Sequence, residues 1–493
     1  MSKRISRALI SILMVVSILL VGCGNTILKL EAVDYHPEEN KTEELETAKF
    51  TDRLKIPYYS DDSLNPYEAE SLHNFVINTL VYDSLFTLDS QDNPIPLIAL
   101  SIDSLPDGYL VTINTNQKFS DGQNITYEDI VYSFELAKNH KYYGPALKHV
   151  TNIEKQTDST FKITLDEPDI YFARCLTFPI IKPMADGLPI GSGRFIFNDD
   201  YTKLFPSRTS IRKVNRIKQI DLVPTVSEEN LSFSLMDNGI DLMYSDLQSK
   251  VNIGVGIGYR QVPINNLVYL GANPYILNNT LRKYISANID RDAISRNAFT
   301  GFAKPTNYPI KTDNYDKNLY DIQELEQKLL NQGYKKDVNN QWIFGGNYVT
   351  INILVNKESS DKIVIGEYLQ KLLVQMGFQS SLIKQDYKTY LYNINTENYG
   401  IYVGEMKLLH NNDLSSLLFN KYEKYSTFYP NLLESYITMK TIPESEEQFK
   451  TTFTEEIPII PIVFRRGILC YSRDFSANIV ATEQDIFYNI ENW

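Results

Sequence analysis

The segment 349–383 constrains the fold more than any other part of this chain. It places an apolar run at 349–355 before a long helical pattern at 361–376, which Gly377 ends, and a second apolar run follows at 378–383. A strand, a helix and a strand in this order form a β-α-β unit with parallel strands and a right-handed crossover. This unit predicts that the second half of the chain is an α/β lobe.

The N-terminus has the pattern of a bacterial lipoprotein signal. Lys3, Arg4 and Arg7 precede an apolar run. That run covers 8–22, and it ends in the tetrad Leu-Val-Gly-Cys, whose last residue is Cys23. The run is shorter than the roughly 20 residues that cross a bilayer as a helix. We therefore expect cleavage before Cys23 and diacylation of its thiol rather than a membrane-spanning helix.

The stretch that follows the signal, residues 23–50, is acidic and has little apolar periodicity. A segment of this kind buries too little apolar surface to fold, so we expect a flexible tether. With residues 1–22 removed as a signal peptide, the folded body is predicted to stand at the extracytoplasmic face of the bacterial cell membrane, anchored by lipid at Cys23.

The charge of the chain limits the partners that it can have. The formal net charge is −13 at pH 7, and the signal segment contributes only basic residues, so the mature chain is more acidic still. An acidic surface repels phosphate backbones, which excludes nucleic acid as a partner class. The 43% of hydrophobic residues is enough for sizeable cores, and no later apolar run is long enough to span a membrane.

Cysteine and histidine usage predicts no metal site and no cofactor. If Cys23 is lipidated, Cys175 and Cys470 remain, and the sequence leaves open whether they pair. The five histidines are scattered, without the i, i+4 spacing or the Cys-x-x-Cys pairs of metal sites.

Catalytic motifs are absent from the sequence. It contains no Gly-x-Ser-x-Gly elbow, His-Glu-x-x-His helix or phosphate-binding loop, and the glycines at 254–258 lack the spacing of a dinucleotide site. Adjacent carboxylates such as Asp61 and Asp62 are more simply explained as a solvated surface. The chain is therefore predicted to bind rather than to catalyse.

Short apolar and alternating runs predict further elements along the chain. The predicted strands lie at 54–59, 109–114, 161–165, 194–197, 217–223, 240–243, 268–271, 400–403 and 457–464. The predicted helices lie at 68–80, 228–238, 279–287, 290–298 and 321–332. Another helix is expected after Thr126, which caps it with Asp129 three residues on.

Residues 119–134, Phe-Ser-Asp-Gly-Gln-Asn-Ile-Thr-Tyr-Glu-Asp-Ile-Val-Tyr-Ser-Phe, resemble the signature of the family 5 extracellular solute-binding proteins, the peptide- and nickel-binding receptors of ABC importers. Similar segments recur in the family's order at 190–193, 220–224, 238–241, 289–294, 329–334 and 456–461. Together they cover nearly the whole mature chain from about Leu54.

The resemblance implies an α/β fold of the periplasmic-binding-protein type (type II, cluster C-like), with two lobes, a two-stranded hinge and an extra subdomain in the first lobe. The hinge crossings would fall near Leu270 and near Glu456. The implied parts are a lobe I core at 51–82, 188–269 and 457–493, the extra subdomain at 83–187 and lobe II at 270–456.

Solute would bind between the lobes, so the candidate contacts are loop residues that face the cleft. In lobe I they are Tyr59, Ser60, Asp61, Asn65, Gly191, Ser192, Gly193 and Arg194, and in lobe II they are Tyr402, Gly404, Glu405, Met406 and Asp413. Peptide-binding members carry a Gly-Trp pair and then an Asp after the corresponding strand, and this chain has neither in place. Glu405 or Asp413 could hold an ammonium group instead, through a charge-assisted hydrogen bond.

The leading hypothesis is a monomeric, lipid-anchored receptor that closes on a small peptide or similar zwitterionic solute and delivers it to an ABC permease with its ATPases. The missing Trp and Asp favour an alternative, a degenerate receptor that acts as a sensor or a protein-interaction lipoprotein. A further alternative, nickel or metal-chelate binding, rests on the breadth of the family.

Overall fold

The computed structural model describes residues 52–247, 257–419, 429–472, 475 and 478–493. These residues belong to one compact unit, which begins at Lys49. The predicted signal peptide (1–22), the lipidation site Cys23 and the tether (23–50) lie outside the described residues. None of the helices in the described ranges combines the length and the apolar character that a membrane crossing requires.

The first core is built from both ends of the chain. Leu54 and Ile56 pack in it together with Phe487, Ile490 and Trp493. The elements around it are β1 (Arg53–Tyr59), α2 (Leu72–Val81), β8 (Phe195–Phe197), β9 (Lys203–Pro206), β10 (Gln219–Thr225) and the 3-10 turn η2 (Ile490–Asn492). Their sheet has the order β1-β10-β9-β8, and β1 lies parallel to β10. The tail of the chain therefore returns to its first strand.

A second core is formed by the part of the chain between α2 and β8, which includes the segment 119–134. Thr126 and Asp129 form a capping box at the start of α3 (Tyr127–Asn139), and Ile130 and Phe134 are buried. The other elements are β2 (Phe86–Leu88), β3 (Pro94–Pro96), β4 (Ala99–Leu105), β5 (Gly108–Ile113), α4 (Gly144–Leu147), β6 (Val150–Lys155), β7 (Thr160–Leu165) and η1 (Phe172–Cys175). The segment thus serves the packing of this subdomain.

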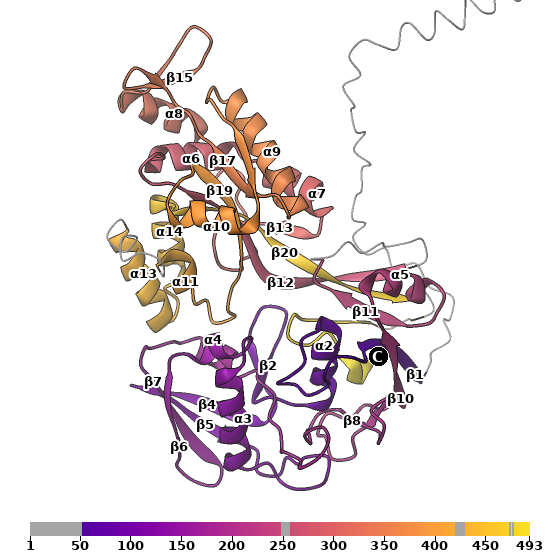
Figure 1. Cartoon of the computed structure of the whole chain (residues 1–493). Helices are drawn as coiled ribbons and strands as arrows, with labels where there is room; N and C mark the ends of the chain where they lie inside the picture. Colours follow the sequence, from indigo (N-terminus) through magenta and orange to yellow (C-terminus); the bar gives the residue numbers. More distant parts are fainter. Residues whose placement is uncertain (1–51, 248–256, 420–428, 473–474, 476–477) are drawn as a thin grey trace, which may run out of the picture. The chain divides into compact units, whose positions relative to one another are not determined.

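Two long antiparallel strands, β12 (Ile257–Ala272) and β20 (Ile459–Ser472), pair with each other along most of their length. Figure 1 shows them side by side between the part that carries α5 (Glu228–Met236) and β11 (Leu242–Ser245) and the part that carries α9 (Ser360–Gln375). Two connections that lie side by side in this way are what a hinge between lobes needs.

Both strands change from one core to another in mid-strand. In β12, Val262 packs in the first core and Leu270 packs in the core of the α/β part. In β20, Leu469 packs in the first core and Ile460 packs in the core of the α/β part. The ladder is irregular just after Pro263. The predicted crossings, near Leu270 and near Glu456, lie at the ends of these strands. The change of core leaves no break in the apolar pattern of either strand.

The predicted β-α-β unit is present, with shorter strands. β17 (Ile353–Asn356) and β18 (Leu382–Gln385) are parallel, and α9 connects them. The sheet has the order β11-β20-β12-β19-β17-β18, where β19 (Ile401–Lys407) is parallel to β17 and antiparallel to β12. The mixed sheet confirms an α/β fold.

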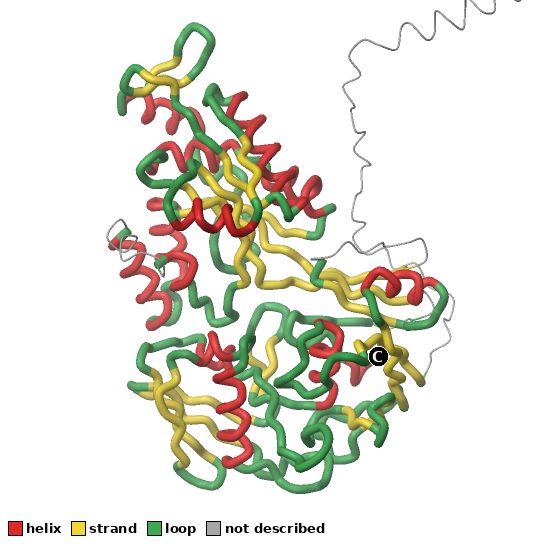
Figure 2. The backbone as a smooth tube through the Cα atoms, in the orientation of Figure 1, coloured by secondary structure: helices red, strands yellow, loops and turns green. Residues whose placement is uncertain are grey.

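Helices and short strands complete this part of the molecule, and Figure 2 shows the helices flanking the strands. They are α6 (Asn279–Asn288), α7 (Arg291–Phe299), β13 (Ala303–Pro305), α8 (Ile322–Asn331), β14 (Lys335–Lys336), β15 (Trp342–Phe344), β16 (Asn347–Tyr348), α10 (Tyr387–Asn395), α11 (Ser415–Leu418), α13 (Pro430–Thr441) and α14 (Glu446–Glu456). Asp290 and Asp321 cap α7 and α8, as their positions in the sequence predict.

Cys175 and Cys470 are both free and buried. Cys175 packs in the core of the extra subdomain, whereas Cys470 packs against α5 and β11. The pairing that the sequence leaves open does not occur.

Candidate functional site

A cavity of about 310 Å³ lies between the extra subdomain and the α/β part. Its lining includes Tyr142, Tyr143, Lys148 and Arg174 on the subdomain side, and Met406, Leu408, His410 and Asp413 at the end of β19 and in the loop after it. The two walls touch where Arg174 Nη1 donates a hydrogen bond to the carbonyl oxygen of His410 at 3.2 Å. A rotation about β12 and β20 would therefore open or close this cavity.

Asp413 is the carboxylate in the described lining of this cavity, and three groups donate to it. Lys148 Nζ lies 2.7 Å from its Oδ2, the N–H of Ser415 donates to Oδ1 at 2.9 Å, and the Tyr436 hydroxyl donates at 3.1 Å. Burial alone would raise the pKa of Asp413, but the hydrogen bonds from Lys148 and Ser415 hold that pKa well below its usual range. The carboxylate is therefore ionised and oriented, and its charged partner comes from the opposite wall.

Further ion pairs join the same two walls. Asp92 lies 2.9 Å from Lys311 Nζ and 2.9 Å from His410 Nδ1, and Asp169 lies 2.7 Å from Lys440 Nζ. Burial would raise the pKa of Asp92, but the hydrogen bond and charge of His410 and the charge of Lys311 hold it well below its usual range. Charged contacts thus also join the extra subdomain to the α/β part.

Glu405 does not line this cavity. It accepts hydrogen bonds from Lys362, from Arg465 at 3.1 Å and from Asn266 at 3.1 Å. Burial would raise the pKa of Glu405, but the charges of Lys362 and Arg465 hold it below its usual range. Glu405 is therefore an internal counter-ion, and of the two carboxylates suggested for an ammonium group only Asp413 faces the cavity.

A neighbouring cavity of about 400 Å³ lies in the α/β part and is rich in tyrosine. Its lining includes the sequence-derived candidates Tyr402, Gly404, Glu405 and Met406 together with Tyr269, Tyr387, Tyr390 and Tyr399. Met406 and Ser416 line both cavities. A Cβ at Gly404 would come within 2.7 Å of the Tyr269 ring, so glycine at this position makes room for that ring.

The first group of lobe I candidates, Tyr59, Ser60, Asp61 and Asn65, lies in the loop after β1 and lines none of these cavities. Ser60 and Asp61 are exposed. The backbone N–H and carbonyl oxygen of Tyr59 bond to Asn74 at 2.8 and 2.9 Å. The structure therefore places this loop against α2 and away from Asp413.

The second group, Gly191, Ser192, Gly193 and Arg194, is buried. A Cβ at Gly191 would come within 2.1 Å of the carbonyl oxygen of Val81, so this turn needs glycine to pack against α2. Arg194 is fully buried, and its guanidinium donates to Asp485 at 2.7 Å and to the carbonyl oxygen of Phe487 at 2.7 Å. These contacts leave Arg194 no surface for a solute, which argues against this part of the sequence prediction.

Sequence reasoning missed Lys148, Arg174 and His410, which belong to the cavity. Lys148 and Asp413 are 265 positions apart in the numbering. No local pattern marks such a pair, because it exists only once two distant loops are brought together. Within the described residues, no group of three or more His, Cys, Asp or Glu side chains is arranged to hold a metal ion.

The three cores, the paired long strands and the cavity define an α/β binding protein of the periplasmic-binding-protein type, cluster C. An ABC transporter substrate-binding protein from Sinorhizobium meliloti has the same fold, with a TM-score of 0.73 at 17% identity over 89% of this chain and 99% of the other. A nickel ABC transporter protein from Bacillus halodurans gives a TM-score of 0.73 at 16% identity, over 88% and 98%.

The family follows from the sequence match. The profile for the middle region of the bacterial extracellular solute-binding proteins, family 5, matches residues 93–423, which is more than half of the chain. The chain therefore belongs to the family 5 bacterial extracellular solute-binding proteins. This is a family of binding proteins and not of enzymes.

Individual relatives are distant. The glutathione-binding protein GsiB of Pectobacterium atrosepticum is 23% identical over 368 residues, which cover 66% of this chain and 67% of that protein. A Brucella ovis protein, provisionally named an ABC transporter peptide-binding protein, is 24% identical over 353 residues, which cover 64% of this chain and 63% of the relative. The chain thus spans less than two thirds of the length of the Brucella relative.

Proposed function

We propose that this chain is the solute receptor of an ABC importer and that it binds a small peptide or a similar zwitterion in the cavity beside Asp413. Membership of the family supports a receptor, and relatives are named for peptides, glutathione and nickel. One observation carries the choice of ligand: Lys148 and Asp413 neutralise each other across the cavity at 2.7 Å. Separating this pair offers one carboxylate and one ammonium group, which are the two charges that a zwitterion needs.

In this proposal the ammonium group of the solute takes the place of Lys148 at Asp413. The N–H of Ser415 and the hydroxyl of Tyr436 keep the carboxylate oriented for a charge-assisted hydrogen bond. Lys148 and Arg174, both on the opposite wall, are then available to the solute carboxylate. The bound solute therefore bridges the two walls in place of the direct ion pair.

The remaining parts of the proposal concern how the receptor is built and where it works. We assign lobe I to 51–82, 188–269 and 457–493, the extra subdomain to 83–187 and lobe II to 270–456. The receptor is a monomer without cofactor, anchored by lipid at Cys23 on the extracytoplasmic face of the cell membrane. It delivers solute to an ABC permease with its ATPases.

A thermal-shift panel tests this function. It contains mixed di- to pentapeptides, free amino acids, and nickel with and without chelators. A ligand at about 100 times its dissociation constant adds roughly 2.7 kcal/mol to stability, which raises the melting temperature measurably. We expect a peptide or another zwitterion to raise it in the wild type and in the matched control Asp158→Asn, whose carboxylate is exposed, but not in Asp413→Asn.

Other outcomes separate the alternatives. A response to nickel or its chelates alone would contradict the zwitterion proposal in favour of metal-chelate binding. If the folded protein responds to no member of the panel, this result would favour the alternative of a degenerate receptor that binds a partner protein.

A further inference from the structure

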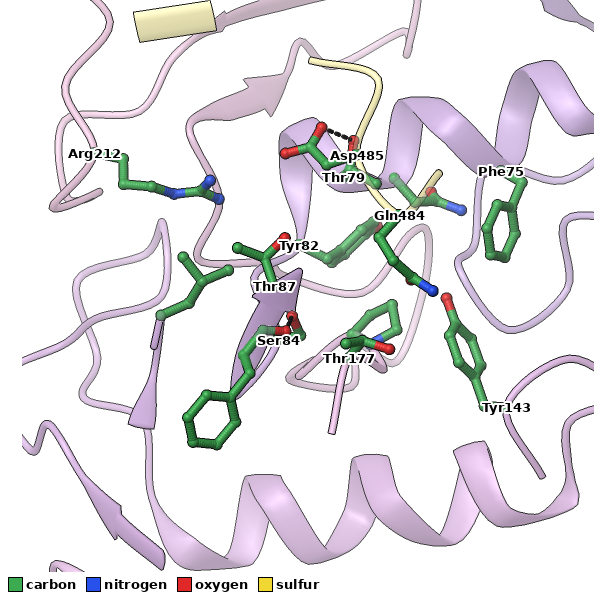
Figure 3. A pocket seen from close by; sticks show the side chains of 14 residues that line it. Phe75, Thr79, Tyr82, Ser84, Thr87, Tyr143, Thr177, Arg212, Gln484 and Asp485 are labelled. Atoms are coloured by element: carbon green, nitrogen blue, oxygen red, sulfur yellow. Dashed lines mark hydrogen bonds between the residues drawn. The ribbon is translucent and has the colours of Figure 1, made fainter. Parts of the chain in front are cut away.

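A smaller cavity of about 40 Å³ continues from the one beside Asp413 toward lobe I. The two cavities share three lining side chains, those of Tyr143, Thr177 and Gln484. Figure 3 shows the hydroxyl of Tyr143 and the amide of Gln484 pointing toward each other. We take these three residues as the neck between the two cavities.

The lining beyond the neck combines apolar side chains with polar ones, and two of the polar side chains have unused hydrogen-bonding atoms. Asn78 is 3% exposed, and within the described residues neither Oδ1 nor Nδ2 of its carboxamide has a partner. Nε of Arg212 has none there either. A buried polar group without a partner costs about 1–3 kcal/mol. Such groups therefore mark a place where a polar group binds, and the Asn78 carboxamide offers it one donor and one acceptor side by side.

The charges at this end of the cavity disfavour an anion. Arg212 pairs with Asp83 and lies 3.8 Å from Glu491, and Arg194 pairs with Asp485 at 2.7 Å. The hydrogen bond from the Thr79 hydroxyl to Asp485, at 2.9 Å, is the dashed line in Figure 3. Three carboxylates against two guanidinium groups leave the cluster acidic, so a solute carboxylate would be repelled.

We propose that the small cavity is a subsite for an uncharged carboxamide group of the bound solute, such as the side-chain end of a glutamine residue in a small peptide. The carbonyl oxygen of that group accepts a hydrogen bond from Asn78 Nδ2, and its amide nitrogen donates to Asn78 Oδ1, so that the two carboxamides form a pair. The volume of about 40 Å³ admits only a small end group, while the neck surrounds the methylene stem. The inference rests on the proposed function, because the charged ends of the same solute lie in the larger cavity.

Titration calorimetry of the full-length protein with the near-isosteric dipeptides Gly-Gln, Gly-Glu and Gly-Met tests the subsite. We expect Gly-Gln to bind at least about tenfold more tightly than the other two, because a site with buried polar groups rejects analogues that leave them unpaired. Asn78→Leu should abolish the preference and retain the binding of Gly-Met. Asn116→Leu, an exposed position, is the matched control and should keep the preference.

The outcomes distinguish failure of the subsite from failure of the receptor. Equal affinity for the three dipeptides, or a preference that survives Asn78→Leu, would overturn the carboxamide subsite and leave the proposed function intact. Failure of the wild type to bind any zwitterion would overturn both. If Asn78→Leu does not fold, Asn78→Ser removes the carboxamide with a small side chain, and the same loss of preference is expected.

Discussion

Replacing Glu405 by glutamine should destabilise the α/β lobe and should not remove a ligand contact. The side chains of its partners Lys362 and Arg465 are only 9% and 10% exposed. Glutamine keeps the shape but removes the charge that neutralises both cations. Neutralising one member of a buried ion pair costs about 3–5 kcal/mol. We expect the lower end, about 3 kcal/mol, because Asp361 still lies 3.0 Å from Lys362 and the carbonyl oxygen of Leu247 still accepts from Arg465.

Thermal unfolding followed by circular dichroism at pH 7 measures this effect. A loss of about 3 kcal/mol corresponds to a fall in melting temperature of roughly 6–12 °C for a lobe of about 150–250 residues. The control is Glu367→Gln, whose ion pair with Lys384 is half exposed and which should shift the melting temperature by less than about 2 °C. If Glu405→Gln shifted it no more than the control, Glu405 would not be an internal counter-ion and would again be a candidate for ligand binding.

Three further predictions concern other buried groups. The folded state lowers the pKa of Asp92, so its contribution to stability is complete above the ordinary carboxyl pKa near 4 and is lost as pH falls through the lowered value. In Asp92→Asn, the melting temperature should therefore fall less steeply than in the wild type as the pH is lowered from about 4 to 2. An equally steep fall in the variant would contradict this. Burial raises the pKa of the Cys175 thiol and raises that of Cys470 to about 12. Mass spectrometry should therefore find both cysteines alkylated at pH 8 only after unfolding. Alkylation of either cysteine in the native protein would contradict this prediction. Arg194→Met leaves Asp485, which is 6% exposed, without its guanidinium partner and should destabilise lobe I by about 3 kcal/mol in urea unfolding, whereas a loss below about 1 kcal/mol would show that the pair is dispensable.

The elements that the sequence predicts well depend on neighbours along the chain. The capping box of Thr126 and Asp129 and the β-α-β unit rest on spacings of a few residues, and both are present. The hinge crossings have no such local signal, because β12 and β20 each pack in two cores without a break in their apolar pattern. Local signals thus place the elements but not the boundaries between cores.

The candidate site could be predicted only in part. Asp413 lies in the cavity, but the sequence offers no reason to prefer it to Glu405, since both are carboxylates near the end of one strand. The difference comes from Lys362 and Arg465, which surround Glu405 only in the folded protein. Arg194 is likewise predicted to contact the ligand because it follows a glycine turn. The sequence does not reveal its partner Asp485, which lies almost three hundred residues away.

The central claim is that Asp413 receives the ammonium group of a zwitterionic solute between the lobes. A crystal structure of the protein with a solute that raises its melting temperature tests this most directly. The account predicts a ligand nitrogen about 2.7–3.2 Å from a carboxylate oxygen of Asp413, with Lys148 turned toward the ligand carboxylate. A ligand bound in the tyrosine-rich cavity or elsewhere, with the pair of Lys148 and Asp413 intact, would contradict it.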